Sequence, residues 1–308
     1  MDLPHDSNGL IRRTRALDLG FTDEDIADLL ADETLLRVIR GVYVATDLAP
    51  LRTRTADLYR LRCLAIATGP TRCGVLSHQS AAAVLGLELL EPDRTRVHLT
   101  TGLGKGGMTS PKRHTHCTPL DDTAVQRDGV LLTNVVRTAV DVAVGGTFAQ
   151  ALTVFDSALR IGTPRDELAT VLTHRRRRGI ARARVALAMA DGRAANPGES
   201  WSRAQMIEAG LPLPVLQRRV LLDDDLGEAF PDFTWDDVLA GEFDGEAKYH
   251  DYLREGETEA DVVLKEKNRE NGLRDLGFDV VRWDWPDLKA DRMIPRVTRR
   301  MYRCGLLR

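Results

Sequence analysis

The sequence predicts an α/β fold, α+β over the whole chain, built from more than one domain. The chain has 308 residues, whereas a typical single domain has roughly 100–200. Its hydrophobic fraction of 43% is sufficient for buried cores. Apolar residues recur at helical spacing in some stretches and alternate with polar ones in others. Helices and short strands are therefore expected to follow one another along the chain.

Composition narrows the class of protein before any motif is considered. The 43 basic and 46 acidic residues give a formal net charge of −3, so nucleic-acid binding would have to use local basic patches. No apolar run reaches the roughly 20 residues that a membrane helix needs, and the N-terminus carries charges where a signal peptide is apolar. We therefore expect a cytoplasmic protein without a membrane partner. The 4 cysteines show no CxxC spacing, which predicts free thiols.

Residues 1–50 are predicted to form a helical unit with a β wing. Apolar residues recur at helical spacing over 10–17, and Gly20 closes that helix. Thr22 opens a second helix, and the β-branched stretch 35–45 suits a two-stranded wing. Helix, turn, helix and wing indicate a winged helix-turn-helix that binds DNA. The arginines expected to bind nucleic acid are Arg12, Arg13, Arg37 and Arg40.

Residues 51–145 are predicted to form an α/β domain, in which four histidines raise the question of a metal site. His114 and His116 lie two residues apart, which places both on one face of a strand. His78 and His98 supply no third ligand at a recognisable spacing. A structural or exposed role is therefore the preferred interpretation of all four.

Two helical stretches carry charged residues that we interpret electrostatically. Arg137 and Asp141 lie four residues apart on a predicted helix, which is typical of a helix ion pair worth about 0.2–0.5 kcal/mol. Residues 146–195 are predicted to form a helical connector, and the arginine run 175–178 lies where one of its helices ends. That run either complements the helix dipole, which needs no partner, or contacts phosphates.

Residues 196–308 are predicted to form a third domain, a mixed sheet flanked by helices. Pro197 and Gly198 interrupt a helical stretch and mark its boundary. The expected elements are helix 199–209, strands 216–222, 228–235 and 238–248, helix 259–276, strand 278–284 and helix 291–303. Strands beside helices in this order favour an α/β core.

The strand predicted at 238–248 carries charged residues on one face. Side chains alternate across a strand, so the residues sharing that face are Glu242, Asp244, Glu246 and Lys248. Asp232 in the preceding strand adds another carboxylate. Like charges packed together repel, and a hard cation such as Mg²⁺ relieves that repulsion through carboxylate oxygens. The alternative is a solvated edge strand, whose charges prevent pairing with other sheets.

Three segments cover roughly the last third of the chain. They are Glu199 in NPGESWSRAQMIEAGLP, Asp232 in FPDFTW before EFDGEAK, and KEKNRENGLRDLGFDVVRW at 265–283. This order resembles the PD-(D/E)XK phosphodiesterase core, in the branch allied with very-short-patch-repair endonucleases. The resemblance implies a restriction-endonuclease-like domain that cleaves DNA with Mg²⁺ or Mn²⁺.

The resemblance also implies roles for individual residues. The expected catalytic residues are Asp232, Glu242, Asp244, Lys248 and Glu199, and the metal ligands among them are Asp232, Glu242 and Asp244. If EFDG is the centre of the motif, Glu246 stands where the family has a lysine, which leaves the general base open. On the following helix, Lys265, Lys267 and Arg269 either hold the phosphate backbone or pair with Glu266 and Glu270.

Blocks in the first half of the chain resemble a different family. They are RRTRAL, Gly20-Phe-Thr and RVIRGVYV, followed by LSHQSAAAVLGLEL at 76–89, RVHLTT at 96–101 and GVLLTNVVRTAVDVA at 129–143. Their succession resembles the AbiEi-type antitoxins of type IV toxin–antitoxin pairs. The resemblance implies an N-terminal DNA-binding winged helix and a toxin or defence-system protein as partner.

Two functions follow from these expectations. The first is a metal-dependent nuclease that a winged helix targets to DNA. The alternative is a non-catalytic transcriptional regulator or antitoxin, in which the nuclease fold serves only as a binding body. The unusual position of Glu246 keeps that alternative open.

Overall fold

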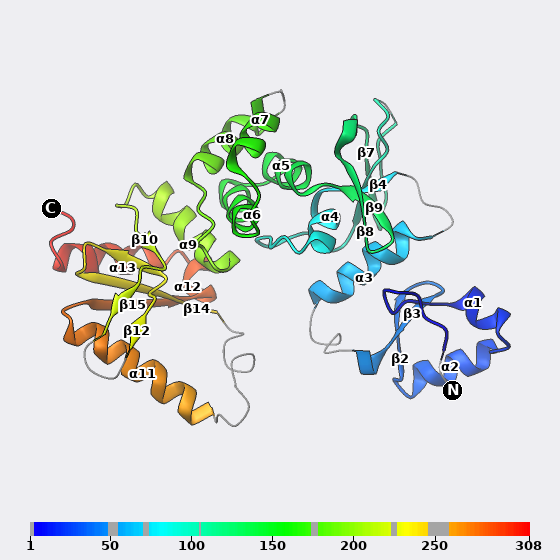
Figure 1. Ribbon diagram of the computed structural model, residues 1–308, viewed down its shortest axis with the longest axis horizontal. Coiled ribbons are helices and arrows are strands. Elements are labelled where there is room, and N and C mark those ends of the chain that lie inside the picture. Colours follow the sequence, from blue (N-terminus) through cyan, green and yellow to red (C-terminus); the bar gives the residue numbers. More distant parts are fainter. Residues whose placement is uncertain are drawn as a thin grey trace. The chain divides into compact units, whose positions relative to one another are not determined.

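The computed structural model describes residues 3–48, 55–69, 74–104, 106–173, 178–222, 227–245 and 259–308 (Figure 1). Within them the protein is mixed α/β of the α+β kind, as the sequence predicts. Unit 1 comprises residues 1–145 and 166–175, and unit 2 comprises residues 146–165 and 176–308. The expected segments 1–50 and 51–145 lie in unit 1, 196–308 lies in unit 2, and the connector 146–195 contributes to both.

The N-terminal region of unit 1 contains short helices and a small antiparallel sheet. Its elements are β1 (Ile11–Arg12), α1 (Arg13–Asp18), α2 (Asp23–Ala31), β2 (Leu35–Ile39), β3 (Val42–Ala45) and the 3-10 helix η1 (Thr46–Leu48). The sheet has the order β1-β3-β2, and the β2–β3 hairpin is the predicted wing. Thr22 caps α2 as predicted, because its hydroxyl accepts from the Asp25 N–H at 3.1 Å and its own N–H donates to the Asp25 carboxylate at 2.7 Å.

The helix predicted over 10–17 begins later than its apolar spacing suggests. Ile11 and Arg12 form β1, which pairs antiparallel with β3, and the helix starts at Arg13. The Arg13 N–H donates to the carbonyl of Gly41 at 3.0 Å, which fastens the start of α1 to the hairpin turn. Pairing with β3 has therefore overridden the local helical pattern.

The remainder of unit 1 is a mixed sheet with helices packed against it. Its elements are α3 (Thr55–Ala67), β4 (Val75–Leu76), α4 (His78–Leu85), β5 (Val97–Thr100), β6 (Met108–Thr109), β7 (Arg113–His116), the 3-10 helix η2 (Asp121–Thr123), β8 (Ala124–Arg127), β9 (Val130–Thr133) and α5 (Val135–Gly145), with α7 (Arg165–Thr173) joining later in the chain. The sheet order is β6-β7-β5-β4-β9-β8, and β5 runs parallel to β7.

The ion pair between Arg137 and Asp141 is present, but its surroundings differ from the expectation. Arg137 Nε donates to Asp141 Oδ2 at 2.6 Å, and the two side chains are only 1% and 0% exposed. The guanidinium also donates to the Pro119 carbonyl and the Thr118 hydroxyl, both at 2.9 Å. The pair therefore fastens α5 to the chain before η2. The value predicted from spacing applies to pairs on a helix surface, so it is wrong for this buried one.

Unit 2 combines a helical layer with a second mixed sheet. Its elements are α6 (Phe148–Arg160), α8 (Ile180–Met189), α9 (Pro197–Glu208), β10 (Val215–Leu216), β11 (Val220–Leu221), β12 (Glu228–Ala229), β13 (Phe233–Trp235), β14 (Leu239–Asp244), α11 (Glu259–Asp275), β15 (Asp279–Asp284), α12 (Trp285–Lys289) and α13 (Met293–Arg303). The sheet order is β10-β13-β14-β15, and β11 pairs with β12 apart from it. The single strands expected at 216–222 and 228–235 are each divided in two. Gln217, with φ of 49°, and Pro231, which lacks an N–H, lie at the two interruptions.

Two glycines make room for aromatic rings at β14. A Cβ on Gly198 would lie 2.0 Å from the Phe243 ring, and a Cβ on Gly241 would lie 2.6 Å from the Trp283 ring. Since real Cβ atoms are excluded from such distances, glycine is required at both positions. Pro197 and Gly198, predicted as a domain boundary, instead lie within unit 2, where the N-terminus of α9 meets the sheet.

Asp156 of α6 is a buried carboxylate that joins three parts of unit 2. It accepts hydrogen bonds from the Asp191 N–H at 2.6 Å, the Ser200 hydroxyl at 2.8 Å and Arg203 at 3.1 Å. Burial raises the pKa of Asp156 to about 6, because the charge of Arg203 and these hydrogen bonds offset the loss of water only in part.

An Asp156→Asn variant tests this electrostatic balance. A carboxyl whose pKa is raised on folding stabilises the fold at low pH, and that contribution is lost as the pH rises from about 4 to about 6. The free energy of unfolding of the wild type relative to the variant should therefore fall by about 2 kcal/mol between pH 4 and pH 7. Tryptophan fluorescence in urea measures it, because the 4 tryptophans all lie in unit 2.

Asp191→Asn is the matched control, with the opposite expected trend. Burial raises the pKa of Asp191, but hydrogen bonds from Arg193 outweigh burial and lower it. The stabilisation from this ionised carboxylate is therefore present at neutral pH and is lost as the pH falls through the acid range. Equal pH dependence in both variants would contradict the interpretation.

None of the helices in the described part of the chain combines the length and the apolarity needed to cross a membrane.

Candidate functional site

Asp232 and Glu242 face each other across the antiparallel pair β13–β14. Phe233 pairs with Gly241, and one further step of this register brings Asp232 opposite Glu242. Opposite residues of an antiparallel pair point to the same face of the sheet. The two residues are 6% and 5% exposed, and Asp232 Oδ2 accepts from the Phe243 N–H at 2.8 Å. The sequence predicted Asp232 on the strand neighbouring that of Glu242, and the register of β13 with β14 brings the two residues to one face.

Glu199 reaches the same neighbourhood from the N-terminus of α9. Asn196 caps this helix and donates through its side-chain amide to Glu199 Oε1 at 2.7 Å, while the Ala195 N–H donates to Oε2 at 2.8 Å. The Gln217 amide connects Glu199 to the acidic pair, since its Nε2 lies 3.0 Å from Asp232 Oδ1 and 3.4 Å from Glu199 Oε2. The sequence analysis missed Gln217. The only feature that could have indicated it is a polar amide side chain directly after an apolar strand.

Asp244 is occupied by an ion pair in this structure. Its two carboxylate oxygens accept from Arg282 of β15 at 2.6 and 2.9 Å. Arg282 also donates to Glu270 at 3.1 Å. Metal binding by Asp244 stays a prediction and would require this pair to open.

The basic residues predicted beside the acids are described only in part. Glu246 and Lys248 lie outside the described residues, as does the side chain of Lys265. Lys267 is exposed, and the guanidinium of Arg269 lies 3.8 Å from Glu242 Oε1. Arg269 therefore places a guanidinium beside one of the two facing carboxylates.

The four arginines predicted to bind nucleic acid line one groove of unit 1. The groove has a volume of about 810 Å³, and its arginines are Arg12, Arg13, Arg37, Arg40 and Arg113. We call it the arginine groove. The start of α1, the turn of the β2–β3 hairpin, the end of α3 and the start of β7 form its walls. Arg113 was missed, because only the fold of the second sheet brings β7 to the hairpin.

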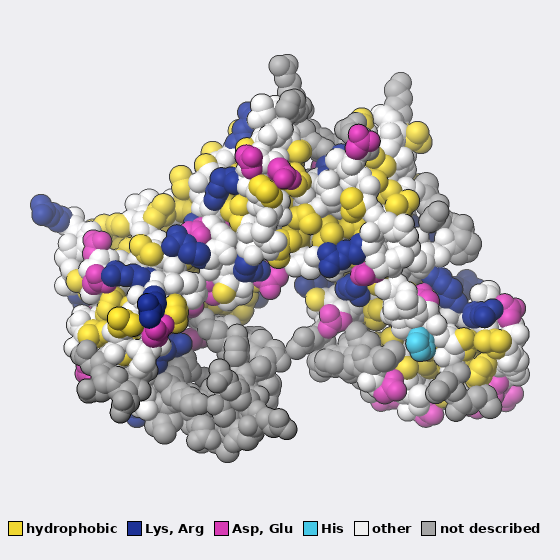
Figure 2. All heavy atoms as spheres, in the orientation of Figure 1, with side chains coloured by type: hydrophobic (Ala, Val, Ile, Leu, Met, Phe, Trp, Pro, Cys, Tyr) yellow, Lys and Arg dark blue, Asp and Glu magenta, His cyan; other side chains and the backbone are white. Residues whose placement is uncertain are grey.

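The arginines of the groove differ in their contacts with the rest of the protein. Arg12 donates to the Thr68 hydroxyl, and Arg13 pairs with Asp23. Arg37 and Arg40 are exposed on the hairpin, where Gly41, with φ of 75°, completes the turn. Figure 2 shows basic side chains interspersed with acidic ones over the face that it draws, which agrees with a formal net charge of only −3.

The helix α2 is poorly suited to approach a phosphate backbone. Its first turn carries Asp23, Glu24 and Asp25, which are all exposed. Repulsion from these carboxylates would oppose the insertion of α2 into a DNA groove. The arginine groove is therefore the more favourable surface of this region for a polyanion.

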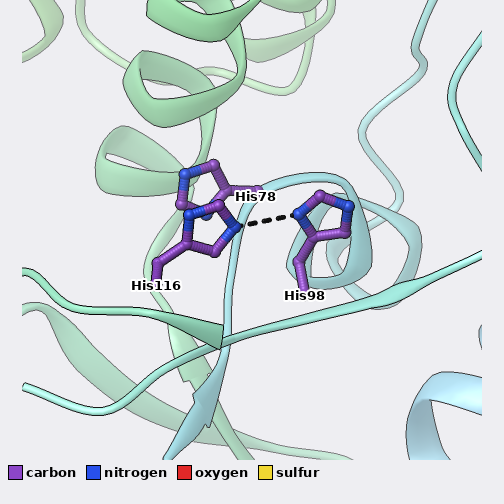
Figure 3. A group of neighbouring side chains, drawn as sticks. All are labelled: His78, His98 and His116. Carbon is purple, nitrogen blue, oxygen red and sulfur yellow. Dashed lines mark hydrogen bonds between the residues drawn. The ribbon is translucent and has the colours of Figure 1, made fainter. Parts of the chain in front are cut away.

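Three histidines form a cluster at the edge of α4 and the second sheet. The potential ligand atoms of His78, His98 and His116 all lie within 4.8 Å of one another (Figure 3). This arrangement differs from the expectation that no third ligand joins the pair at 114 and 116. Burial, and after it the electrostatic effect of neighbouring His114, lower the pKa of His98 to about 4. Within the described residues, the carboxylates of unit 2 form no comparable group of three ligands.

Comparison with known proteins supplies a sequence likeness but no activity. No protein-family model matches the chain. Two curated relatives from Mycobacterium tuberculosis match it: Uncharacterized protein MT2308 of strain CDC 1551 / Oshkosh and Uncharacterized protein Rv2248 of strain ATCC 25618 / H37Rv. Each is 36% identical over 184 residues, which cover 58% of this chain and 64% of the relative. The chain thus spans less than two thirds of the length of these relatives.

Proposed function

We propose that the protein binds DNA through the arginine groove and that unit 2 hydrolyses phosphodiester bonds with Mg²⁺ or Mn²⁺. The observation that carries the proposal is the convergence of five arginines on one groove in a protein whose net charge is −3. Guanidinium groups bind phosphate oxygens with paired hydrogen bonds, and a row of them follows a polyanionic backbone. The resemblance of this region to a winged helix supports DNA as the polyanion.

The acidic pair in unit 2 supports the hydrolytic half of the proposal. Asp232 and Glu242 offer carboxylate oxygens, the donors that Mg²⁺ prefers, and they share a face of the sheet. A bound metal would activate water and stabilise charge on phosphorus. Arg269, 3.8 Å from Glu242, would hold the phosphate beside it.

The second candidate function is a non-catalytic DNA-binding regulator of the AbiEi antitoxin type, with a toxin as partner. The observation that favours it is the ion pair of Asp244 with Arg282, which removes one of the three expected metal ligands. In this alternative the acids of unit 2 only stabilise the fold. The arginine groove serves DNA binding in both functions, so only a cleavage assay separates them.

Neutralising two arginines of the groove tests the binding proposal. An Arg37→Gln/Arg40→Gln variant should weaken binding to a fluorescent DNA duplex by at least about tenfold. Each guanidinium removed neutralises one phosphate fewer, so binding releases fewer counterions from the DNA. The slope of log K against log salt should decrease in magnitude by about 2. Fluorescence anisotropy across a salt series measures both quantities.

Arg15→Gln is the matched control for this experiment. Arg15 is an exposed arginine on α1 that does not line the groove. It changes the net charge of the same region without changing the proposed contact surface. If Arg15→Gln lost as much DNA affinity as Arg37→Gln alone, the binding site would not be localised to the groove. A wild-type protein that binds no duplex would contradict the proposal itself.

A further inference from the structure

The histidine cluster of unit 1 is separate from the features used above and has the composition of a metal site. His78 is the first residue of α4, His98 lies in β5 and His116 ends β7. Imidazole nitrogens are ligands for Zn²⁺, Cu²⁺ and Ni²⁺, whereas Mg²⁺ prefers oxygen. Any metal bound here would therefore differ in class from the metal proposed for unit 2.

The spacing of the three rings is close to that of ligands around one ion. His98 Nδ1 lies 3.0 Å from His116 Nε2, and the ligand atoms of the trio all lie within 4.8 Å of one another. Two nitrogens bound to one tetrahedral Zn²⁺ at about 2.0–2.1 Å are about 3.3 Å apart. Small side-chain rotations would therefore bring the three nitrogens to bonding distance, without movement of the backbone.

The fold holds the three residues independently of their mutual contacts. The parallel pairing of β5 with β7 sets His98 opposite His114 and Thr100 opposite His116. The Ser77 N–H donates to the His98 carbonyl at 3.1 Å, which fixes the start of α4 against β5. Side chains on paired strands and at a helix start are positioned more accurately than side chains on loops.

Hydrogen bonding alone is an incomplete explanation of the cluster. His98 Nε2 is buried and makes no hydrogen bond. His78 stacks on His116 with ring centroids 3.7 Å apart and planes inclined by 13°. Burying polar ring nitrogens costs free energy unless they find partners. A metal bound at His98 Nδ1, the nitrogen that faces His116, would leave Nε2 as it is, so the case for a metal rests on the convergence of the three ligand atoms.

The orientation of His78 has a further feature of metal ligands. Its Nδ1 lies 3.0 Å from the Ser77 hydroxyl, so one ring nitrogen contacts a neighbouring polar group. Ligating histidines typically make such a contact with the ring nitrogen that does not bind the metal. On binding, the His78 ring would tilt out of its stack with His116 while keeping this contact.

We propose that His78, His98 and His116 bind one Zn²⁺ ion or a similar transition metal, with the fourth coordination position open to water or a small anion. All three side chains are only partly buried, so solvent reaches the cluster. Three protein ligands with one open position distinguish this arrangement from closed structural zinc sites. The inference does not depend on DNA binding or hydrolysis.

Metal titration of tag-free protein tests the proposal. After treatment with a chelator, the protein should bind about one equivalent of Zn²⁺ in isothermal titration calorimetry. Co²⁺ in place of Zn²⁺ should give the visible absorption of a tetrahedral or five-coordinate ion. His116→Asn and His78→Gln should each weaken Zn²⁺ binding by at least about tenfold, since even the loss of an outer contact costs that much.

His114→Asn is the matched control, because His114 stacks on His116 with centroids 4.1 Å apart but is not one of the three ligands. It should retain Zn²⁺ binding within about threefold of the wild type, a change of less than 1 kcal/mol. Circular dichroism shows whether each variant is folded. Absence of stoichiometric binding in the wild type, or equal loss in folded His114→Asn and His116→Asn variants, would overturn the proposal.

Discussion

Replacing Arg137 with methionine should lower the free energy of unfolding of unit 1 by about 3–5 kcal/mol. The substitution removes one member of a fully buried ion pair and leaves the Asp141 carboxylate without its guanidinium. It also removes the donors to Pro119 and Thr118. A buried carboxylate that loses its ion-pair partner costs far more than the pair contributes to stability, which makes this one of the largest effects expected in the chain.

Hydrogen exchange of peptides from α5, followed by mass spectrometry, measures this loss. Tryptophan fluorescence provides an internal reference, because all tryptophans lie in unit 2. An Arg137→Met/Asp141→Leu double variant should regain at least about half of the stability, since replacing both members of a buried pair is often neutral. Arg193→Met breaks a pair in which Arg193 is exposed and Asp191 only partly buried, and it should cost less than about 1 kcal/mol. Similar losses in the two single variants would contradict the argument.

The sequence was informative where structure depends on neighbouring residues. The cap at Thr22 and the turn at Gly41 each follow from one residue type whose local conformation or hydrogen bond is favourable. Pro197 and Gly198 open α9, but the two units do not divide there, and the sequence could not show why glycine is needed at position 198. That reason is the ring of Phe243, which lies far along the chain.

Burial and long-range pairing account for what the sequence did not reveal. The spacing of Arg137 and Asp141 indicated a pair but not its desolvation, which multiplies its energetic importance. The histidine cluster depends on the parallel pairing of β5 with β7, and no local pattern encodes that register. Features set by residues close together in the chain could therefore be predicted, whereas features set by residues far apart in the chain could not.

The candidate acidic site shows the same division. Side-chain alternation along β14, which the sequence suggested, sets the face of Glu242, whereas the register that brings Asp232 opposite it comes from the pairing of β13 with β14. Arg282 forms an ion pair with Asp244 because β15 lies parallel beside β14, and the sequence did not specify that arrangement. A charged face can therefore be predicted, whereas the partner of each charge depends on which strand becomes its neighbour.

Asp232→Ala and Glu242→Gln should each reduce Mg²⁺-dependent cleavage of DNA by about 10³-fold or more. The proposed metal contributes several kcal/mol to the transition state, and each 1.36 kcal/mol corresponds to about tenfold in rate. Cleavage of labelled plasmid and single-stranded DNA, with Mg²⁺ or Mn²⁺ and with chelator as the blank, measures this loss. Anisotropy on the same samples should show unchanged DNA binding, because the arginine groove lies in unit 1.

Two control variants make the outcome specific to the proposed site. Asp237→Asn removes an exposed carboxylate that pairs with Arg218 near the same hairpin and should leave cleavage unchanged. Asp244→Asn separates the possible roles of Asp244: cleavage at the wild-type rate assigns it to the ion pair with Arg282, and loss of cleavage without loss of folding assigns it to the metal. Cleavage that persists in Asp232→Ala would rule out this site, because a carboxylate that binds the essential metal cannot be dispensable. A wild-type protein that binds DNA tightly but cleaves none with either metal would favour the regulator, since the groove would then account for the whole activity.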